Sequence, residues 1–279
     1  MTAARSRRIR SVFHTLVFYT VWAFVGLAFT FVLYVPVRLL SRPFPAVLRP
    51  MRAFTRGFYG VLVRSLSATG ALRIAEIAGV ERLRRGGPAV VVANHRTMMD
   101  VLILMWLLPD ASCLLKPMEK PPEDQPRNAM PDFWKPFIAA PFSLLGYVPM
   151  PPVWNDREAL KNTLDRCRAL LAEGRPLGIF PEGTRSPDGR LLPFRDFAFH
   201  LAKDAGVPLI PVAIHTDTRF MPQGTASINS ARRCTYRLRV LADIVPTPGT
   251  RSSDLLVEVR HRIQKAVAEG DAKYGYLDA

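Results

Sequence analysis

The chain has 279 residues, of which 49% are apolar and 22% are charged, and its formal net charge is +15. This composition supplies enough apolar material for a sizeable core and excludes a mainly disordered protein. The length fits one domain with an appended segment. The three cysteines (Cys113, Cys167 and Cys234) are far apart and lack metal-ligand spacing, so we expect free, buried thiols in a reducing compartment.

The positive charge is concentrated at the N-terminal end. Residues 1–75 contain eleven arginines and no aspartate or glutamate, and the first acidic residue is Glu76. The arginines flank a long apolar run and do not line a polar helix. This pattern favours an anionic lipid surface as partner and argues against nucleic acid.

The apolar run covers residues 12–40, and residues 12–34 carry no charge. About 20 such residues are enough to span a bilayer. A cleaved signal peptide is one interpretation, but the run is long for that role and no clear cleavage site follows it. A single transmembrane helix is another, although the basic residues on both sides give it little orientation.

The third interpretation is a helical hairpin that dips into one leaflet, broken at Pro43 and Pro45, with a second helix over residues 51–67. We favour this interpretation because a hairpin returns both basic flanks to the same side of the membrane. The sequence thus predicts a membrane-associating hairpin over residues 1–68 and an α/β domain over residues 69–279.

From residue 72 onward, short apolar runs alternate with amphipathic segments, which predicts an α/β fold with a mixed, largely parallel central sheet flanked by helices. The clearest helix is expected over residues 156–173, capped by Asn155 with Glu158 three residues later. The proline-rich stretch 117–136 is expected to be a loop. The other predicted helices cover 98–108, 194–205 and 252–268, and the predicted strands cover 72–77, 89–93, 112–116, 177–180, 207–214 and 234–244.

The first stretch with a chemical pattern is Asn94-His95-Arg96-Thr97-Met98-Met99-Asp100, directly after a predicted strand. On a regular helix, residues five apart point about 140° away from each other. A turn between strand and helix would instead bring the Asp100 carboxylate beneath the His95 imidazole. Asp100 would then fix the tautomer and leave the other ring nitrogen as a base for a hydroxyl group. A histidine beside a helix-capping aspartate is the alternative, and the spacing alone does not decide between them.

The second stretch is Phe180-Pro181-Glu182-Gly183-Thr184-Arg185-Ser186, which also follows a predicted strand. Gly183 permits close backbone approach, and Arg185 offers a bidentate fork that suits phosphate. An ordinary polar turn is the alternative. The carboxyl ends of parallel strands are where open α/β sheets build their sites, which favours a shared site for the two stretches.

These two blocks in this order, followed by Val207-Pro208-Leu209-Ile210-Pro211-Val212, resemble the lysophosphatidic acid acyltransferase family, the 1-acylglycerol-3-phosphate O-acyltransferases of the glycerolipid acyltransferase superfamily. The resemblance covers about residues 71–245. It implies an α/β domain preceded by a two-helix membrane motif at the cytoplasmic face of the membrane. It also implies acyl transfer from acyl-CoA or acyl-carrier protein to a lyso-lipid hydroxyl, with no metal, no cofactor and no acyl group bound to the protein.

The resemblance also implies roles for individual residues. His95 is expected to be the general base and Asp100 the residue that orients it. Backbone amides near the glycine suit the oxyanion. Lys116, which follows a strand near the site, is a candidate for contact with the donor's phosphates. The acceptor's glycerol phosphate is expected to bind Glu182, Gly183, Thr184 and Arg185.

The family's second block departs from its usual pattern. The stretch is Gly146-Tyr147-Val148-Pro149-Met150-Pro151-Pro152, with proline where a phosphate-binding arginine is expected. Arg157 or Lys161 are candidates to replace that arginine. The acceptor therefore stays open between lysophosphatidic acid and a lyso-lipid with another head group. A non-catalytic, membrane-anchored lipid-binding protein is the other alternative, whereas a serine hydrolase is disfavoured because no G-x-S-x-G motif occurs.

Overall fold

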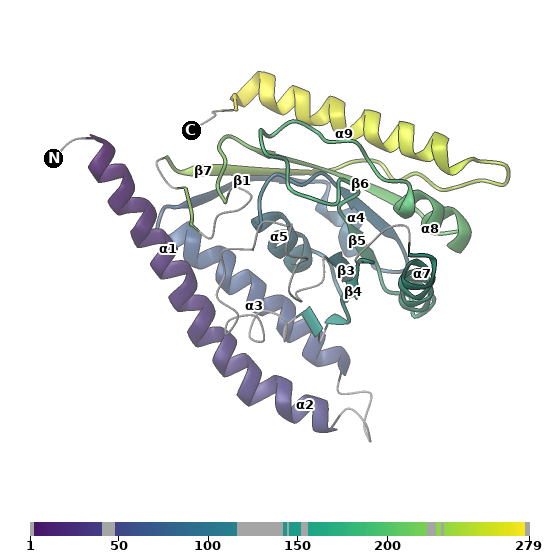
Figure 1. Ribbon diagram of the computed structural model, residues 1–279, viewed down its shortest axis with the longest axis horizontal. Coiled ribbons are helices and arrows are strands. Elements are labelled where there is room, and N and C mark those ends of the chain that lie inside the picture. Colours follow the sequence, from purple (N-terminus) through teal and green to yellow (C-terminus); the bar gives the residue numbers. More distant parts are fainter. Residues whose placement is uncertain are drawn as a thin grey trace.

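The structure is a computed structural model that describes residues 3–40, 48–115, 142–143, 145–151, 156–221, 227–229 and 232–276. Within these residues a seven-stranded sheet has the order β1-β7-β6-β2-β5-β3-β4, and Figure 1 shows it as the centre of the molecule. The strands are β1 (Leu72–Ala78), β2 (Val90–Ala93), β3 (Ser112–Leu115), β4 (Val148–Pro149), β5 (Leu177–Ile179), β6 (Leu209–Thr216) and β7 (Cys234–Val240).

Most neighbouring strands run in the same direction. Among the described strands, β6 and β7 are the antiparallel pair, and the other five pairs are parallel. The prediction of a mixed, largely parallel sheet is therefore confirmed. Parallel pairing brings the carboxyl ends of β2, β5, β3 and β6 to one edge of the sheet, and antiparallel β7 begins at that same edge.

Helices cover both faces of the sheet. The helices α3 (Leu48–Ala68) and α5 (Met99–Leu107) lie on one face. The other face is covered by α7 (Arg157–Ala172), α8 (Phe197–Ala205) and α9 (Ser252–Tyr274). Figure 1 shows α9 along one side of the sheet and α1 and α3 on the opposite side. A short helix, α4 (Val80–Arg84), links β1 to β2.

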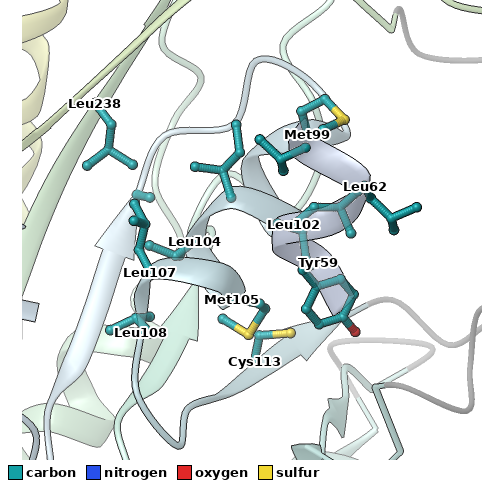
Figure 2. Close-up of a cluster of buried hydrophobic side chains, with 14 of the residues drawn as sticks. Tyr59, Leu62, Met99, Leu102, Leu104, Met105, Leu107, Leu108, Cys113 and Leu238 are labelled. Atoms are coloured by element: carbon teal, nitrogen blue, oxygen red, sulfur yellow. The ribbon is translucent and has the colours of Figure 1, made fainter. Parts of the chain in front are cut away.

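Strand β2 shows why both faces must be covered. Successive side chains of a strand point to opposite faces, and all four residues of β2 are buried. Val90 and Val92 join the apolar cluster formed with α7, α8 and α9, whereas Val91 and Ala93 join the cluster formed with α3 and α5. Figure 2 shows part of the second cluster, where Tyr59 of α3 lies against α5.

The N-terminal residues form two antiparallel helical arms. The first arm is α1 (Ala3–Ala28), continued by a π-helical segment (Phe29–Tyr34) and α2 (Val35–Leu40), and the second is α3. The His14 imidazole lies 3.0 Å from the Thr69 carbonyl oxygen, and the Trp22 ring packs edge-on against Phe58. Since residues early in α1 meet residues late in α3, the arms run in opposite directions.

The outer surface of the first arm is apolar. Its exposed large apolar side chains include Phe13, Leu16, Phe24, Phe31 and Val32. Within the described residues, one helical stretch, 5–28, is long and apolar enough to cross a membrane, and only 22% of its most apolar window is buried. The N-terminal helix is therefore a candidate membrane anchor.

Several predicted boundaries differ from the structure. Asp156 caps α7, because its carboxylate accepts a hydrogen bond from the Ala159 amide at 3.0 Å; Asn155 lies outside the described residues. The predicted helix 194–205 begins only at Phe197, and the predicted strand 234–244 ends at Val240. Helix α9 continues to Tyr274, six residues beyond its predicted end. The short elements α4 and β4 were not predicted, and the predicted loop 117–136 lies outside the described residues.

The described thiols agree with the sequence-based expectation. Cys113, Cys167 and Cys234 are all buried and unpaired. Burial raises the pKa of each of these groups, because a thiolate is poorly solvated in an apolar core. The three cysteines therefore remain protonated and behave as small apolar side chains.

Candidate active site

The candidate site lies at the edge where β2 and β5 end and β7 begins. His95 comes two residues after β2, and Glu182 comes three residues after β5. These strands run parallel, as the sequence predicted, and they are neighbours in the sheet. Tyr236, near the start of β7, pairs with Thr216 at the end of β6, so its side chain is also available at this edge.

Asp100 is the most constrained side chain of the site. It lies in the first turn of α5 and is 0% exposed. Its Oδ2 atom accepts hydrogen bonds from the backbone amides of Arg96 and Thr97 at 2.7 and 2.8 Å. Its Oδ1 atom accepts one from the Tyr236 hydroxyl at 3.1 Å. These three donors hold the side chain in one orientation at the N-terminus of α5.

The His95 imidazole lies directly against this carboxylate. The His95 Nδ1 atom is 2.9 Å from Asp100 Oδ2, so the turn between β2 and α5 brings together two side chains that a regular helix would separate. Because the carboxylate can only accept, we assign the proton to Nδ1. The other ring nitrogen, Nε2, is then unprotonated in the neutral imidazole. The ring packs against Phe180 with a centroid distance of 4.4 Å, and the side chain is 13% exposed.

Glu182 connects the two motif loops. Its Oε1 atom accepts a hydrogen bond from the His95 amide at 2.7 Å, and Oε2 accepts one from the Leu192 amide at 2.8 Å. The Ser186 amide adds a further link by donating to the His95 carbonyl at 2.8 Å. Burial raises the pKa of Glu182 to about 7, although the two amide hydrogen bonds oppose this rise. Both carboxylate oxygens are thus committed to the protein backbone.

The residues after Glu182 form an open turn. Gly183 has φ +68°, a conformation that side-chain-bearing residues rarely adopt. Gly183, Thr184 and Arg185 are all half-buried and therefore accessible from the site. The Arg185 guanidinium donates to the Met221 carbonyl at 2.8 Å. Burial lowers the pKa of Arg185, and the negative charge of Asp100 opposes this change.

The altered second block lies beside the same turn. Met150 directly follows β4, and its amide donates to the Leu115 carbonyl at 2.7 Å. A small pocket is lined by Met150, Phe180, Gly183 and Arg195, among others. The Arg195 Nε atom would lie 3.2 Å from a Cβ placed on Gly183. The structure therefore adds an arginine beside Gly183 that the motif analysis did not single out, whereas Arg157 and Lys161 are exposed on α7.

Three further side chains at the site were missed by the sequence analysis. Tyr236 bonds Asp100, as described above. The Asn94 amide exchanges two hydrogen bonds with the Ile214 backbone, at 2.7 and 3.0 Å, and so fixes the end of β2 to β6. The buried Arg96 guanidinium bonds Asp271 on α9. Asn94 and Arg96 lie inside a motif that was already recognised, whereas the alternating pattern of β7 gave no sign that Tyr236 faces the site.

Two other expectations concern ligands. Lys116 lies outside the described residues, so its contact with the donor stays a prediction. Within the described part of the chain, no group of three or more His, Cys, Asp or Glu side chains is arranged to hold a metal ion.

Comparison with known proteins gives consistent results. A 1-acyl-sn-glycerol-3-phosphate acyltransferase from Arabidopsis thaliana chloroplasts, LPAT1, is 28% identical over 263 residues, which are 94% of this chain and 65% of the plant protein. The human 1-acyl-sn-glycerol-3-phosphate acyltransferase beta is 27% identical over 218 residues, 74% of this chain and 68% of the human protein. The chain thus spans about two thirds of the length of these relatives.

A solved structure has the same fold. The Thermotoga maritima 1-acyl-sn-glycerophosphate acyltransferase PlsC aligns with a TM-score of 0.69 and 21% identity, covering 94% of this chain and 97% of that protein. The sequence model of the Acyltransferase family matches residues 74–215, which include both motif loops. With this match over half of its length, the chain belongs to the acyltransferase family.

Proposed function

We propose that the protein transfers a fatty acyl group from acyl-CoA or acyl-carrier protein to the free hydroxyl of lysophosphatidic acid or a related lyso-lipid. The observation that carries this proposal is the His95–Asp100 pair, in which a fully buried carboxylate contacts a partly exposed imidazole. The names of the curated relatives support lysophosphatidic acid as the acceptor.

The proposed reaction uses the acceptor hydroxyl as its nucleophile. His95 Nε2 takes the proton of the hydroxyl while the hydroxyl oxygen attacks the carbonyl carbon of the thioester. A carbon–oxygen bond forms, the carbon–sulfur bond breaks, and the thiolate leaving group takes the proton from the imidazolium. Asp100 stabilises that imidazolium without being protonated itself. No acyl group is attached to the protein at any step.

The turn at Gly183, Thr184 and Arg185 is proposed to bind the acceptor's glycerol phosphate. Arg185 supplies the cation, and a glycine at this position keeps the backbone amides open to the phosphate or to the oxyanion. Glu182 was predicted to bind the acceptor too. Its two backbone hydrogen bonds favour a different contribution, in which it fixes the His95 loop against the Arg185 loop.

The hairpin formed by residues 1–68 is proposed to hold the enzyme on the cytoplasmic face of the membrane. Its outer apolar side chains suit the hydrocarbon region, and its arginines suit anionic head groups. A lyso-lipid acceptor is itself anchored in the leaflet, so attachment keeps enzyme and acceptor in the same layer.

The test uses the purified full-length protein in detergent with radiolabelled acyl-CoA, or acyl-carrier protein, and lysophosphatidic acid. We expect phosphatidic acid from the wild type and a loss of about 1,000-fold in kcat for His95→Ala. His261→Ala is the matched control, because His261 is exposed on α9. Equal turnover by the wild type and His95→Ala would refute the mechanism. Stoichiometric lipid binding without product from any donor would instead support the non-catalytic alternative.

The head group of the acceptor has a specific alternative, which is a lyso-lipid with a head group other than that of lysophosphatidic acid. Met150 and Pro151 occupy the second block and are buried there, so this block offers no cation to a phosphate. A panel of lysophosphatidic acid, other lysophospholipids and lyso-aminolipids separates the acceptors. If kcat/KM is highest for lysophosphatidic acid, this lipid is supported as the acceptor. If kcat/KM is higher for a lyso-lipid with a larger head group, the alternative acceptor is supported.

A further inference from the structure

Arg96 links the catalytic loop to the C-terminal helix. Its backbone amide donates to Asp100, but its side chain points away and is only 2% exposed. One guanidinium nitrogen donates to the Thr216 carbonyl at 3.1 Å. The other donates to both carboxylate oxygens of Asp271 on α9, at 2.7 and 3.0 Å. A single residue therefore touches the catalytic carboxylate at one end and α9 at the other.

Tyr276, just after α9, contacts both loops of the site. Its ring centroid is 4.9 Å from the Arg96 guanidinium carbon. The same ring lies against Gly189, where an added Cβ would approach the ring to 2.3 Å. Gly189 is in the loop between Ser186 and Leu192, the two residues whose amides bond His95 and Glu182. Tyr276 thus packs on both loops, which carry His95 and the residues that follow Glu182.

Helix α9 is well placed to act as a rigid support. It packs along β6, as Figure 1 shows. Gly270 allows this close approach, because a Cβ there would lie 2.9 Å from the His215 ring. His215 Nε2 is also 3.2 Å from Asp271 Oδ1. Asp271 therefore lies against the sheet on one side while it holds Arg96 on the other.

We propose that Asp271 is a positioning residue for acyl transfer. With the assistance of Tyr276, Asp271 holds Arg96 in place and through Arg96 it positions the Asp100–His95 pair. The proposal rests on the proposed function. The match to the family model ends at residue 215, so this contribution comes from a part of the chain beyond the matched segment. The physical reason is charge: without Asp271, the buried guanidinium keeps its charge but loses its carboxylate partner, so we expect Arg96 to shift together with the loop that carries it.

The test compares Asp271→Asn with Glu269→Gln, which removes an equal charge two residues away on the same helix. Glu269 forms an exposed ion pair with Arg239 at 3.0 Å and serves as the matched control. We expect Asp271→Asn to lower kcat by about 10- to 100-fold while KM changes by less than about threefold, because displaced catalytic groups slow the chemical step more than binding. Asp271→Glu should recover part of the loss, and Glu269→Gln should match the wild type.

Hydrogen exchange measured by mass spectrometry gives a readout that does not depend on activity. The amides of residues 95–97 donate to Glu182 and Asp100. In Asp271→Asn we expect faster exchange in residues 94–100 and 186–192, with residues 252–268 unchanged. If Asp271→Asn fails to fold, the same exchange measurement is made on Tyr276→Leu, which removes the aromatic ring, and on Tyr276→Phe, which retains it. Tyr276 is half-buried, so we expect both variants to fold.

The outcomes separate the two proposals. Wild-type protein without acyl transfer refutes the proposed function, while the exchange result still tests whether Asp271 holds the loop. Unchanged kcat and unchanged exchange at residues 94–100 in Asp271→Asn refute the positioning role. Faster exchange throughout α9 would also refute it, because Asp271 would then serve only the docking of the helix.

Discussion

The substitution Asp100→Asn tests whether the buried carboxylate acts through its charge. An asparagine fits the same space, and its carbonyl oxygen can accept from His95, Arg96 and Thr97 in place of Oδ2. Its amide group would then donate to the Tyr236 hydroxyl, which can accept as well as donate. The fold should therefore survive, with a loss of about 1–2 kcal/mol in the free energy of unfolding.

The effect on catalysis should be much larger. At a charge separation of about 4 Å and an effective dielectric constant of about 20, the carboxylate stabilises the imidazolium by about 4 kcal/mol. Each 1.36 kcal/mol in the barrier is about tenfold in rate, so kcat should fall by roughly 1,000-fold. Initial rates of acyl transfer at saturating donor and acceptor measure this directly, and Asp243→Asn, at an exposed ion pair with Arg82, is the control.

A double-mutant cycle makes this test specific. If Asp100 acts only through His95, then Asp100→Asn should cost little further rate once His95 is alanine. A folded Asp100→Asn protein that keeps kcat within tenfold of the wild type would refute the charge argument. Equal losses in the presence and absence of His95 would show that Asp100 serves the site by another route.

Three other predictions follow from the geometry. Between pH 4.5 and about 7, folded Glu182 keeps a proton that the unfolded chain has released, so its contribution to stability falls as pH rises through this window. In denaturant titrations, the free energy of unfolding of the wild type should therefore decline by about 3 kcal/mol relative to that of Glu182→Gln. A difference between the two proteins that does not change with pH would contradict the raised pKa. Gly183→Ala should lower the free energy of unfolding by about 1–2 kcal/mol, because alanine is strained at a positive φ, and it should also reduce acyl transfer. The control is Gly174→Ala, at φ +76° with open space around it, which should lower the free energy of unfolding by the same amount and leave kcat normal. Phe24→Asp and Phe31→Asp alter exposed residues of the first arm and should each weaken co-sedimentation with anionic liposomes by about tenfold; unchanged sedimentation would argue against that face as the membrane contact.

Local patterns predicted the sheet and the two motif loops well. The β-branched run at residues 89–93 is apolar throughout. This pattern predicts a buried strand, and β2 is indeed buried between the two helical layers. The turn that joins His95 to Asp100 was also predictable, because a helix alone cannot bring the two side chains together. In the second case the deciding interaction joins residues only five apart along the chain.

Other features depend on partners that are remote in sequence. The predicted start of α8 was three residues too early because the Arg195 amide donates to the Pro181 carbonyl, which holds residues 194–196 to the site loop. Helix α9 continues past Gly270, normally a sign of a helix end, because the glycine makes room for His215. Arg96 and Asp271 are 175 residues apart, and no periodicity in either segment indicates that they meet.

The contacts of α1 bear on how a soluble form of this enzyme can be engineered. The Thr15 hydroxyl accepts a hydrogen bond from the Ile228 amide. The amide of the next residue, Asn229, donates to the Phe220 carbonyl. The carbonyl of Met221, which follows Phe220, accepts the hydrogen bond from Arg185. Phe18, Trp22 and Phe29 are buried on the inner side of the same arm. Deleting the arm would therefore remove these contacts of the loop proposed to bind the acceptor, along with the candidate anchor. Replacing the outward-facing side chains with polar ones should remove the proposed affinity for lipid and keep those contacts in place.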